Sequence, residues 1–178
     1  IIMKIIHLFT AIVVLTILSC SPKLEDGIYA KVSTNKGEIQ LQLTYDQTPV
    51  TVANFVSLAE GTNTQVDSIH SGKPYYDGLI FHRVIKNFMI QTGGFTFDFT
   101  SRESNRSAIL NESANGLKNK RGTVAMARTS DPNSAKAQIF INHKDNDFLD
   151  SKGNKIGYAV FGKIVSEMFL FSNHNALI

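Results

Sequence analysis

The chain has 178 residues, of which 43% are hydrophobic and 19% are charged, and its formal net charge is +3. This length and balance are typical of one globular domain with a sizeable core, and they exclude a disordered chain and a coiled coil. The lysines and arginines are scattered rather than grouped in runs, so we expect no nucleic-acid partner.

The first twenty residues differ from the rest of the chain. Lys4 precedes an apolar run over residues 5–18, and Cys20 follows it. This pattern predicts a secretory signal peptide over residues 1–19, because the run is short for a membrane span. The stretch ILSC also resembles the lipobox of bacterial lipoproteins, which implies lipid on Cys20 and a membrane anchor outside the cytoplasm. The alternative is a plain secretory signal in which Cys20 has no role.

The sequence predicts a single domain after the signal. Residues 20–27 are expected to form a short polar tether, and residues 28–178 to form the domain, since no repeat or low-complexity segment interrupts them. Cys20 is the only cysteine, so no disulfide can form within the chain. We expect a monomer.

Residues 29–43 alternate between apolar and polar side chains. The alternation places Ile39, Leu41 and Leu43 on one face, and Asn35-Lys36-Gly37 supplies a turn. The segment therefore predicts a β-hairpin with one buried face.

A helix is predicted to begin at Thr48 and Pro49. Threonine is a favoured N-cap residue, and proline is tolerated in the first helical turn. Gly61 is expected to end the helix. The apolar residues at helical spacing are Val52, Phe55, Val56 and Ala59.

The remaining chain reads as short strands separated by polar loops. The predicted strands are residues 79–85, 88–91, 123–128, 137–142 and 158–164, with a further short strand where Phe95, Phe97 and Phe99 alternate. Many short strands with one clear helix predict an all-β barrel or sandwich.

Two kinds of chemistry find little support in the sequence. The chain has no Gly-x-Ser-x-Gly stretch, and its single cysteine directly follows the signal, which argues against nucleophilic hydrolysis. Asp145, Asp147 and Asp150 form a cluster that suggests calcium, but the twelve-residue loop pattern is missing, so a solvated loop is favoured. We expect no metal and no cofactor.

Residues 81–94, FHRVIKNFMIQTGG, place strong hydrogen-bond donors among apolar side chains. The stretch contains no Ser, Cys, Asp or Glu that could act as nucleophile or acid. Strand periodicity places Met89 and Gln91 on one face, and it gives Phe81 and Arg83 a common face on the neighbouring strand. A donor-rich apolar surface is the strongest candidate site in the chain.

Other residues near this stretch have structural and functional interpretations. His82 points away from Arg83 by strand parity, and a buried histidine bonded to the backbone is favoured over a functional one. In AQIFIN, Gln138 and Phe140 share a face. Each of these residues, taken alone, is more often part of a core than of a site.

Five stretches, in order and at the expected spacing, resemble the cyclophilin-type peptidyl-prolyl isomerases. They are TPVTVANFVSLAEG, YYDGLIFHRVI, FHRVIKNFMIQTGG, GTVAMAR with QIFIN and FLD after it, and YAVFGKI. The resemblance runs from about Ala30 to about Val165, and details such as NESANGLKNKRGTVAMARTSD are most similar to the bacterial periplasmic members.

The resemblance implies both a fold and a site. The fold would be an eight-stranded closed barrel with capping helices. The activity would be cis/trans isomerisation of X-Pro bonds in unfolded or flexible proteins, with Arg83 and Gln91 as catalytic residues. The implied substrate-binding residues are Phe88, Met89, Ala127, Arg128, Gln138, Phe140, Phe148, Leu149 and Tyr158.

The end of the chain departs from the family pattern. After GKIVSEM the family continues into a final strand that pairs with the first, whereas FLFSNHNALI does not match and is too short to supply it. Either the sequence is cut or shifted in frame, or the barrel is open. An open barrel would leave the first strand with an unpaired edge.

The sequence as a whole predicts a peptidyl-prolyl isomerase that acts in protein folding at the bacterial cell envelope, outside the cytoplasm. A membrane-anchored lipoprotein is expected, with a soluble periplasmic protein as the alternative. Two rival functions are a module that binds proline-containing segments without turnover and a chaperone of the cell envelope. A purely structural envelope protein is the least favoured.

Overall fold

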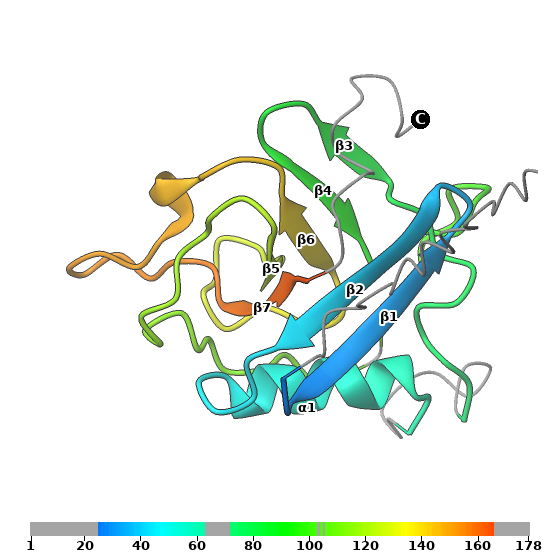
Figure 1. Ribbon diagram of the computed structural model, residues 1–178, viewed down its shortest axis with the longest axis horizontal. Helices are drawn as coiled ribbons and strands as arrows, with labels where there is room; N and C mark the ends of the chain where they lie inside the picture. The colour runs from blue at the N-terminus through cyan, green and yellow to red at the C-terminus, as the bar shows by residue number, and fades with distance from the viewer. Residues whose placement is uncertain (1–24, 63–71, 103, 105, 166–178) are drawn as a thin grey trace, which may run out of the picture.

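The computed structural model describes residues 25–62, 72–102, 104 and 106–165. In this part of the chain seven strands form one antiparallel sheet in the order β1-β2-β7-β5-β6-β4-β3. The strands are β1 (Ile28–Thr34), β2 (Gly37–Leu43), β3 (Arg83–Ile85), β4 (Met89–Thr92), β5 (Thr123–Met126), β6 (Ile139–Asn142) and β7 (Val160–Ile164). Figure 1 shows the sheet curling around, with the helix α1 (Pro49–Ala59) across its lower end. The predicted signal with Cys20, and the tail from residue 166, lie outside the described residues.

The all-β class predicted from the sequence agrees with this sheet, but closure into a barrel does not appear in it. Within the described ranges the sheet ends at β1 and β3, so it forms a half-barrel. The same ranges contain one α-helix and one 3-10 helix, η1 (Asp147–Leu149), rather than several capping helices. None of the described helices is both long and apolar enough to cross a membrane.

The predicted hairpin is confirmed. β1 pairs with β2 from Ile28 opposite Leu43 to Thr34 opposite Gly37. Ile39 and Leu41 join Leu43 in the core, with at most 3% of each residue exposed. The alternation in the sequence therefore predicted the buried face correctly.

Two faces of the sheet carry separate apolar clusters. The interior cluster consists of Ile39, Leu41, Leu43, Val52, Phe55, Ile90, Ile109, Val124, Met126, Ala135, Ile139, Ile141 and Phe161. The opposite face carries the outer cluster, which consists of Met89, Ala125, Phe140, Leu149 and Val160, with Phe88, Leu117, Ala127 and Tyr158 packed against it. Between β5 and β7 the register shifts after Val124, which allows Phe161 to enter the interior while Val160 joins the outer cluster.

Two strand predictions are wrong in detail. Only residues 83–85 of the predicted strand 79–85 are paired as a strand. Phe81 packs against the interior cluster, not on the face of Arg83, because the period of two applies only within a continuous strand. Residues 95–99 form a turn with isolated bridges instead of a strand.

α1 begins at Pro49 as predicted, but its N-terminus is capped by a distant residue. The hydroxyl of Thr48 donates to the carbonyl oxygen of Thr44, at 2.9 Å, and makes no cap hydrogen bond. The Glu112 carboxylate accepts instead from the backbone N–H groups of Val50, at 3.1 Å, and Thr51, at 2.8 Å. This carboxylate satisfies donors that have no partner within the helix.

Candidate active site

The candidate site begins as a row of residues across four neighbouring strands. Arg83 on β3 lies opposite Gln91 on β4, and Gln91 lies opposite Phe140 on β6. Phe140 in turn lies opposite Ala125 on β5. Because directly opposite residues of antiparallel strands share a face, all four side chains are on the side of the outer cluster.

The outer cluster presents aromatic and aliphatic side chains beside this row. Met89 and Phe140 are 2% and 4% exposed, and the ring of Tyr158 meets that of Phe140 edge to face at 5.7 Å. Phe148 is 60% exposed and stacks on Phe88 with ring centres 5.6 Å apart. The structure thus brings the predicted apolar residues together, with Phe88 and Phe148 at the exposed margin.

A chain of amides ties the arginine to the sheet. The Nη1 of Arg83 donates to the Oε1 of Gln91 at 3.4 Å, and the Nε2 of Gln91 donates to the Oε1 of Gln138 at 2.7 Å. Gly94 makes room for this arrangement, since a Cβ there would lie 2.6 Å from the Gln138 side chain. The absence of a side chain at Gly94 therefore leaves the space that the Gln138 side chain occupies.

The guanidinium of Arg83 lies at the margin of the apolar surface. Its Cζ is 5.9 Å from the centre of the Phe88 ring, close to the limit for a cation–π contact. Within the described residues it forms no ion pair, and its hydrogen bond goes to Gln91. Most of its five N–H donors therefore face no acceptor among the described residues.

A groove of about 400 Å³ lies beside Gln91 and Gln138. Gln91, Gln138 and Ala127 line it on the side of the outer cluster. Its other lining residues come largely from two loops, and sequence reasoning did not single them out: Ser101, Arg102, Ser104, Thr129, Ser134 and Lys136. These loops are polar and have no periodicity, so no local signal marks them as part of a groove.

Arg128 holds the segment that carries Tyr158. Its guanidinium lies over the Tyr158 ring, with Cζ 4.4 Å from the ring centre. It also donates to the carbonyl oxygens of Ile156, at 2.9 Å, Gly157, at 3.3 Å, and Thr129, at 2.9 Å. These bonds make Arg128 a support for Tyr158, while its predicted contact with substrate stays a prediction.

His82 lies apart from the outer cluster. Its ring is 4.7 Å from that of Phe95, and burial lowers its pKa more than the Ile80 backbone raises it. Its buried Nδ1 has no hydrogen-bond partner among the described residues. The histidine is thus of intermediate exposure, whereas the structural interpretation expected a buried one.

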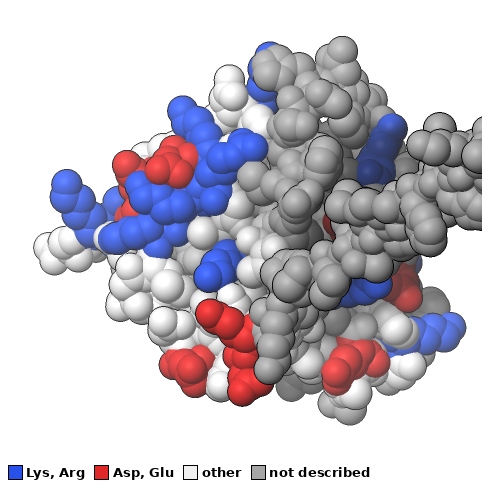
Figure 2. Space-filling model, viewed as in Figure 1, with Lys and Arg blue, Asp and Glu red and all other residues white. Residues whose placement is uncertain are grey.

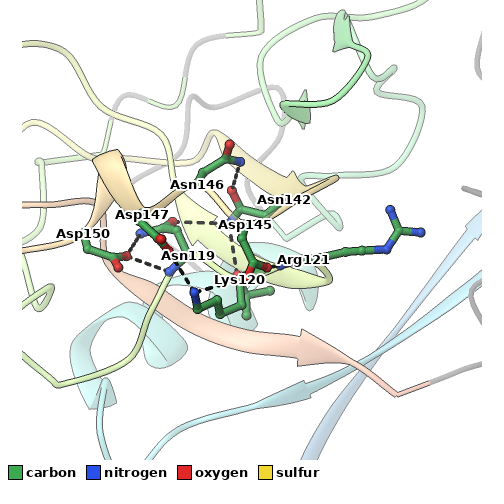
Figure 3. A network of polar contacts seen from close by, with 9 residues as sticks. Asn119, Lys120, Arg121, Asn142, Asp145, Asn146, Asp147 and Asp150 are labelled. Carbon is green, nitrogen blue, oxygen red and sulfur yellow. Dashed lines mark hydrogen bonds and ion pairs between the residues drawn. The ribbon is translucent and has the colours of Figure 1, made fainter.

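Behind the outer cluster lies a buried network of polar side chains (Figure 3). Asn119, Asn142 and Asn146 are at most 1% exposed, and Asp150 is 9% exposed. The Oδ1 of Asp150 accepts from the backbone N–H and the side-chain amide of Asn119, at 2.8 and 3.0 Å. Asn142 donates to Asn119 at 3.2 Å, and Asn146 donates to Asn142 at 2.7 Å.

This network joins three segments that carry residues of the outer cluster. Asn146 donates to the carbonyl oxygen of Phe88 at 2.9 Å. Asp150 directly follows Leu149, whose carbonyl oxygen accepts from the N–H of Tyr158 at 2.9 Å. The network is therefore well placed to set the relative positions of Phe88, Leu149 and Tyr158.

The three aspartates that suggested calcium do not converge on one point. Asp145 and Asp147 form ion pairs with Lys120, at 3.1 and 2.8 Å, whereas Asp150 is turned into the buried network. Hydrogen bonds from the backbone of Arg121 and from Lys120 lower the pKa of Asp145. No group of three potential metal ligands occurs in the described part of the chain.

Replacing Asp150 by alanine is expected to destabilise the protein by about 2–3 kcal/mol, because two buried donors of Asn119 lose their acceptor. Asp150→Asn retains one carbonyl oxygen and should lose less than half as much. Chemical denaturation of both variants measures the difference. Equal stability of Asp150→Ala and the parent would contradict the role assigned to the network.

Basic and acidic side chains are mixed on the face that Figure 2 shows. Lysines and arginines gather where η1 and the neighbouring loops lie, and acidic side chains lie among them.

Several known proteins are similar to this chain in sequence and in fold. The sequence pattern of the family described as "Cyclophilin type peptidyl-prolyl cis-trans isomerase/CLD" matches residues 29–176. Peptidyl-prolyl cis-trans isomerase A of Dickeya dadantii is 42% identical over 163 residues, which cover 90% of this chain and 79% of that protein. Peptidyl-prolyl cis-trans isomerase B of Escherichia coli is 45% identical over 138 residues, 76% of each chain.

A solved structure is also similar. It is a cyclophilin-type peptidyl-prolyl cis-trans isomerase of Cryptosporidium parvum, crystallised in the presence of the dipeptide Ala-Pro. The TM-score is 0.60 at 26% identity, over 79% of this chain and 80% of that one.

The chain therefore belongs to the family of cyclophilin-type peptidyl-prolyl cis-trans isomerases, and the enzyme class predicted from the sequence is confirmed. The family match reaches residue 176, so the expectation that the resemblance ends near Val165 and excludes FLFSNHNALI is wrong for most of that stretch. Residues 166–178 lie outside the described part of the chain.

Proposed function

We propose that the chain accelerates rotation about X-Pro bonds by holding the proline ring against the outer cluster while Arg83 donates hydrogen bonds to the twisted amide. The observation that carries this proposal is the position of Arg83. Its guanidinium lies beside the Phe88 ring and is bonded to Gln91, which is opposite Phe140. A cation is thus held at the margin of an apolar surface.

The reaction requires neither a nucleophile nor a proton-transfer group. The barrier to rotation, about 18–20 kcal/mol, comes from amide resonance, and no covalent bond is broken. Uncatalysed exchange at X-Pro bonds takes on the order of tens to hundreds of seconds. A catalyst must therefore bind the twisted amide more tightly than either planar form.

Arg83 supplies an interaction that strengthens as the bond twists. The nitrogen of a twisted prolyl amide becomes pyramidal and gains a lone pair, which is a better acceptor than the planar nitrogen. A guanidinium stays charged over the working pH range and presents its donors in a rigid plane. Gln91 and Gln138 restrict the position of that plane through their hydrogen bonds.

The outer cluster contributes by removing water from the amide. The planar amide has more charge separation than the twisted form, so an apolar environment disfavours it relative to the twisted form. Phe140 and Met89 provide the buried part of that surface, and Phe88 and Tyr158 its partly exposed part. Leu149 and Phe148 extend it beside Phe88.

These contributions are of a suitable size. An acceleration of roughly 10⁵ corresponds to about 7 kcal/mol of transition-state stabilisation. One preorganised donor contributes about 3–4 kcal/mol in enzymes where it has been removed. Positioning and desolvation would supply the remainder.

The groove gives the residues flanking proline a place to bind. It shares Gln91, Gln138 and Ala127 with the candidate site, and Ala127 and Arg128 are the predicted contacts for the peptide backbone. The crystal structure of the Cryptosporidium parvum relative was obtained in the presence of Ala-Pro, which supports a proline-containing segment as the ligand.

A protease-coupled assay tests the proposed activity. A protease that cleaves only the trans form reports the isomerisation rate of a short proline peptide. With the chain from residue 21 onward added at micromolar concentration, we expect the slow phase to accelerate in proportion to enzyme concentration. A slow phase that stays at the uncatalysed rate, while the peptide binds, would favour a binding module.

We further propose that the enzyme acts outside the cytoplasm, anchored to a membrane of the cell envelope through lipid on Cys20. The apolar run over residues 5–18 followed by ILSC supports this proposal. In this scheme residues 20–27 are the tether and residues 28–178 the enzyme domain. The mass of the mature N-terminus tests it, since an unmodified start beyond Cys20 would leave a soluble periplasmic enzyme.

A closed eight-stranded barrel also remains a proposal. It requires a strand along the outer edge of β1, which ends the sheet in the described ranges. The family resemblance supports such a strand. Slow hydrogen exchange at the outward-facing amides of β1 would indicate that the edge is paired, and fast exchange would indicate an open sheet.

A further inference from the structure

Two phenylalanines stand out from the surface on the turn over residues 95–101. Phe97 is 82% exposed and Phe99 is 68% exposed, the former being the most exposed large hydrophobic residue in the described part of the chain. Large apolar side chains at this exposure and this spacing contribute little to the core, so the fold does not explain them.

The turn holds these side chains outward in a defined geometry. Phe99 has a φ of 60°, a left-handed conformation that is costly for a bulky residue. The backbone N–H of Thr96 donates to the carbonyl oxygen of Thr100 at 3.1 Å, and that of Phe99 donates to the carbonyl oxygen of Thr96 at 2.9 Å. The Asp98 carboxylate accepts from the hydroxyls of Thr96 and Thr100. Several hydrogen bonds thus maintain a strained backbone that displays the two rings.

The base of the turn is fastened to the wall of the groove. Arg102 donates through Nη1 to the carbonyl oxygens of Tyr75 and Asp77, at 2.9 and 2.8 Å. Its own carbonyl oxygen accepts from the Tyr75 hydroxyl at 2.6 Å. Its backbone N–H donates to Gly94 at 2.8 Å. Ser101 and Arg102 themselves line the groove.

The phenylalanines are thus a short distance from the groove. Ser101 follows Phe99 by two residues, which span at most about 7 Å of extended chain. An extended substrate advances by about 3.3 Å per residue, so a few residues beyond the groove suffice to reach Phe99.

We propose that Phe97 and Phe99 form a docking surface for apolar side chains of an unfolded polypeptide whose proline occupies the candidate site. This inference rests on the proposed function and names the preferred substrate as a long, apolar, unfolded segment rather than a short peptide. Continuity with the groove favours the substrate chain as occupant. Asp98 lies between the two phenylalanines in the sequence, and hydrogen bonds from Thr96 and Thr100 lower the pKa of its carboxyl. Its negative charge disfavours an anionic membrane surface.

The test compares a short proline peptide with the same peptide extended by six residues that include two leucines, at either its N-terminal or its C-terminal end. For the parent protein, one extension is expected to lower KM about tenfold. The double variant Phe97→Ser with Phe99→Asn should lose that gain and keep its kcat/KM for the short peptide within twofold. Asparagine is chosen for position 99 because it tolerates positive φ. Tyr45→Ser, which removes another exposed aromatic ring, serves as the matched control.

Several results would overturn the inference. They are an unchanged KM for both extended peptides, an equal gain in the parent and the double variant, and an equal loss in Tyr45→Ser. Retention of the gain together with loss of self-association or of vesicle binding would assign the rings to a second copy or to a membrane instead. If the parent turned over no peptide, the proposed function would fail, and fluorescence anisotropy of the labelled extended peptides would still test the docking surface.

Discussion

Replacing Arg83 by alanine is expected to lower kcat/KM for a short proline peptide by about 100- to 1000-fold, the cost of losing one preorganised transition-state donor. The fold should survive, because Arg83 is exposed on an edge strand and makes one long hydrogen bond, to Gln91. Most of the loss should appear in kcat, since the interaction is strongest when the amide is twisted. The protease-coupled assay, with thermal unfolding alongside it, measures both effects.

Two further variants make this test specific. Arg83→Lys keeps the positive charge but loses the planar arrangement of donors, so we expect an intermediate activity. Lys86→Ala removes an exposed cation from the turn of the same β3–β4 hairpin and should leave the rate unchanged. Parent-like turnover by Arg83→Ala would show that the guanidinium has no part in catalysis.

Replacing Phe140 by alanine is expected to cost about 3–5 kcal/mol of stability and also to weaken substrate binding. Phe140 is 4% exposed in the outer cluster, where it lies opposite Gln91 and contacts the ring of Tyr158. Removal of its ring leaves a cavity in the surface that would hold proline. Denaturant unfolding measures the first effect, and KM for the proline peptide the second.

The size of this loss determines how the variant must be studied. A typical domain is stable by only about 5–15 kcal/mol, so Phe140→Ala should be assayed at low temperature, where it remains folded. Phe140→Leu retains much of the volume and should lose less stability while still raising KM. If Phe140→Ala unfolded at the parent midpoint with the parent KM, neither role could be maintained.

The periodicity of apolar residues identified the elements that form one uninterrupted stretch of strand or helix. The alternation over residues 29–43 predicted the hairpin and its buried face, and Thr48-Pro49 located the start of the helix. The same rule failed at Phe81, where the chain leaves the strand, and over residues 95–99, where hydrogen bonds from threonines to Asp98 form a turn instead. Side-chain bonds of this kind compete with the sheet and leave no periodic trace.

The family and the row of site residues also followed from the sequence, because each depends on motifs whose spacing is local. The apolar surface beside Arg83 required only that Met89, Gln91 and Phe140 keep their strand parity, and the observed register agrees. The roles assigned to these residues await the experiments above.

The sequence by itself determined the local features of the fold, which are the hairpin, the helix start and the strand faces, and it determined the family. Only the tertiary structure decided that Glu112 caps a helix 61 residues away, that Asn119 meets Asp150 behind the outer cluster, and that Arg102 anchors the turn of Phe97 and Phe99 to the groove. The reason is physical. These contacts join polar residues of separate loops, whose positions depend on how the whole sheet curls rather than on any repeating pattern nearby.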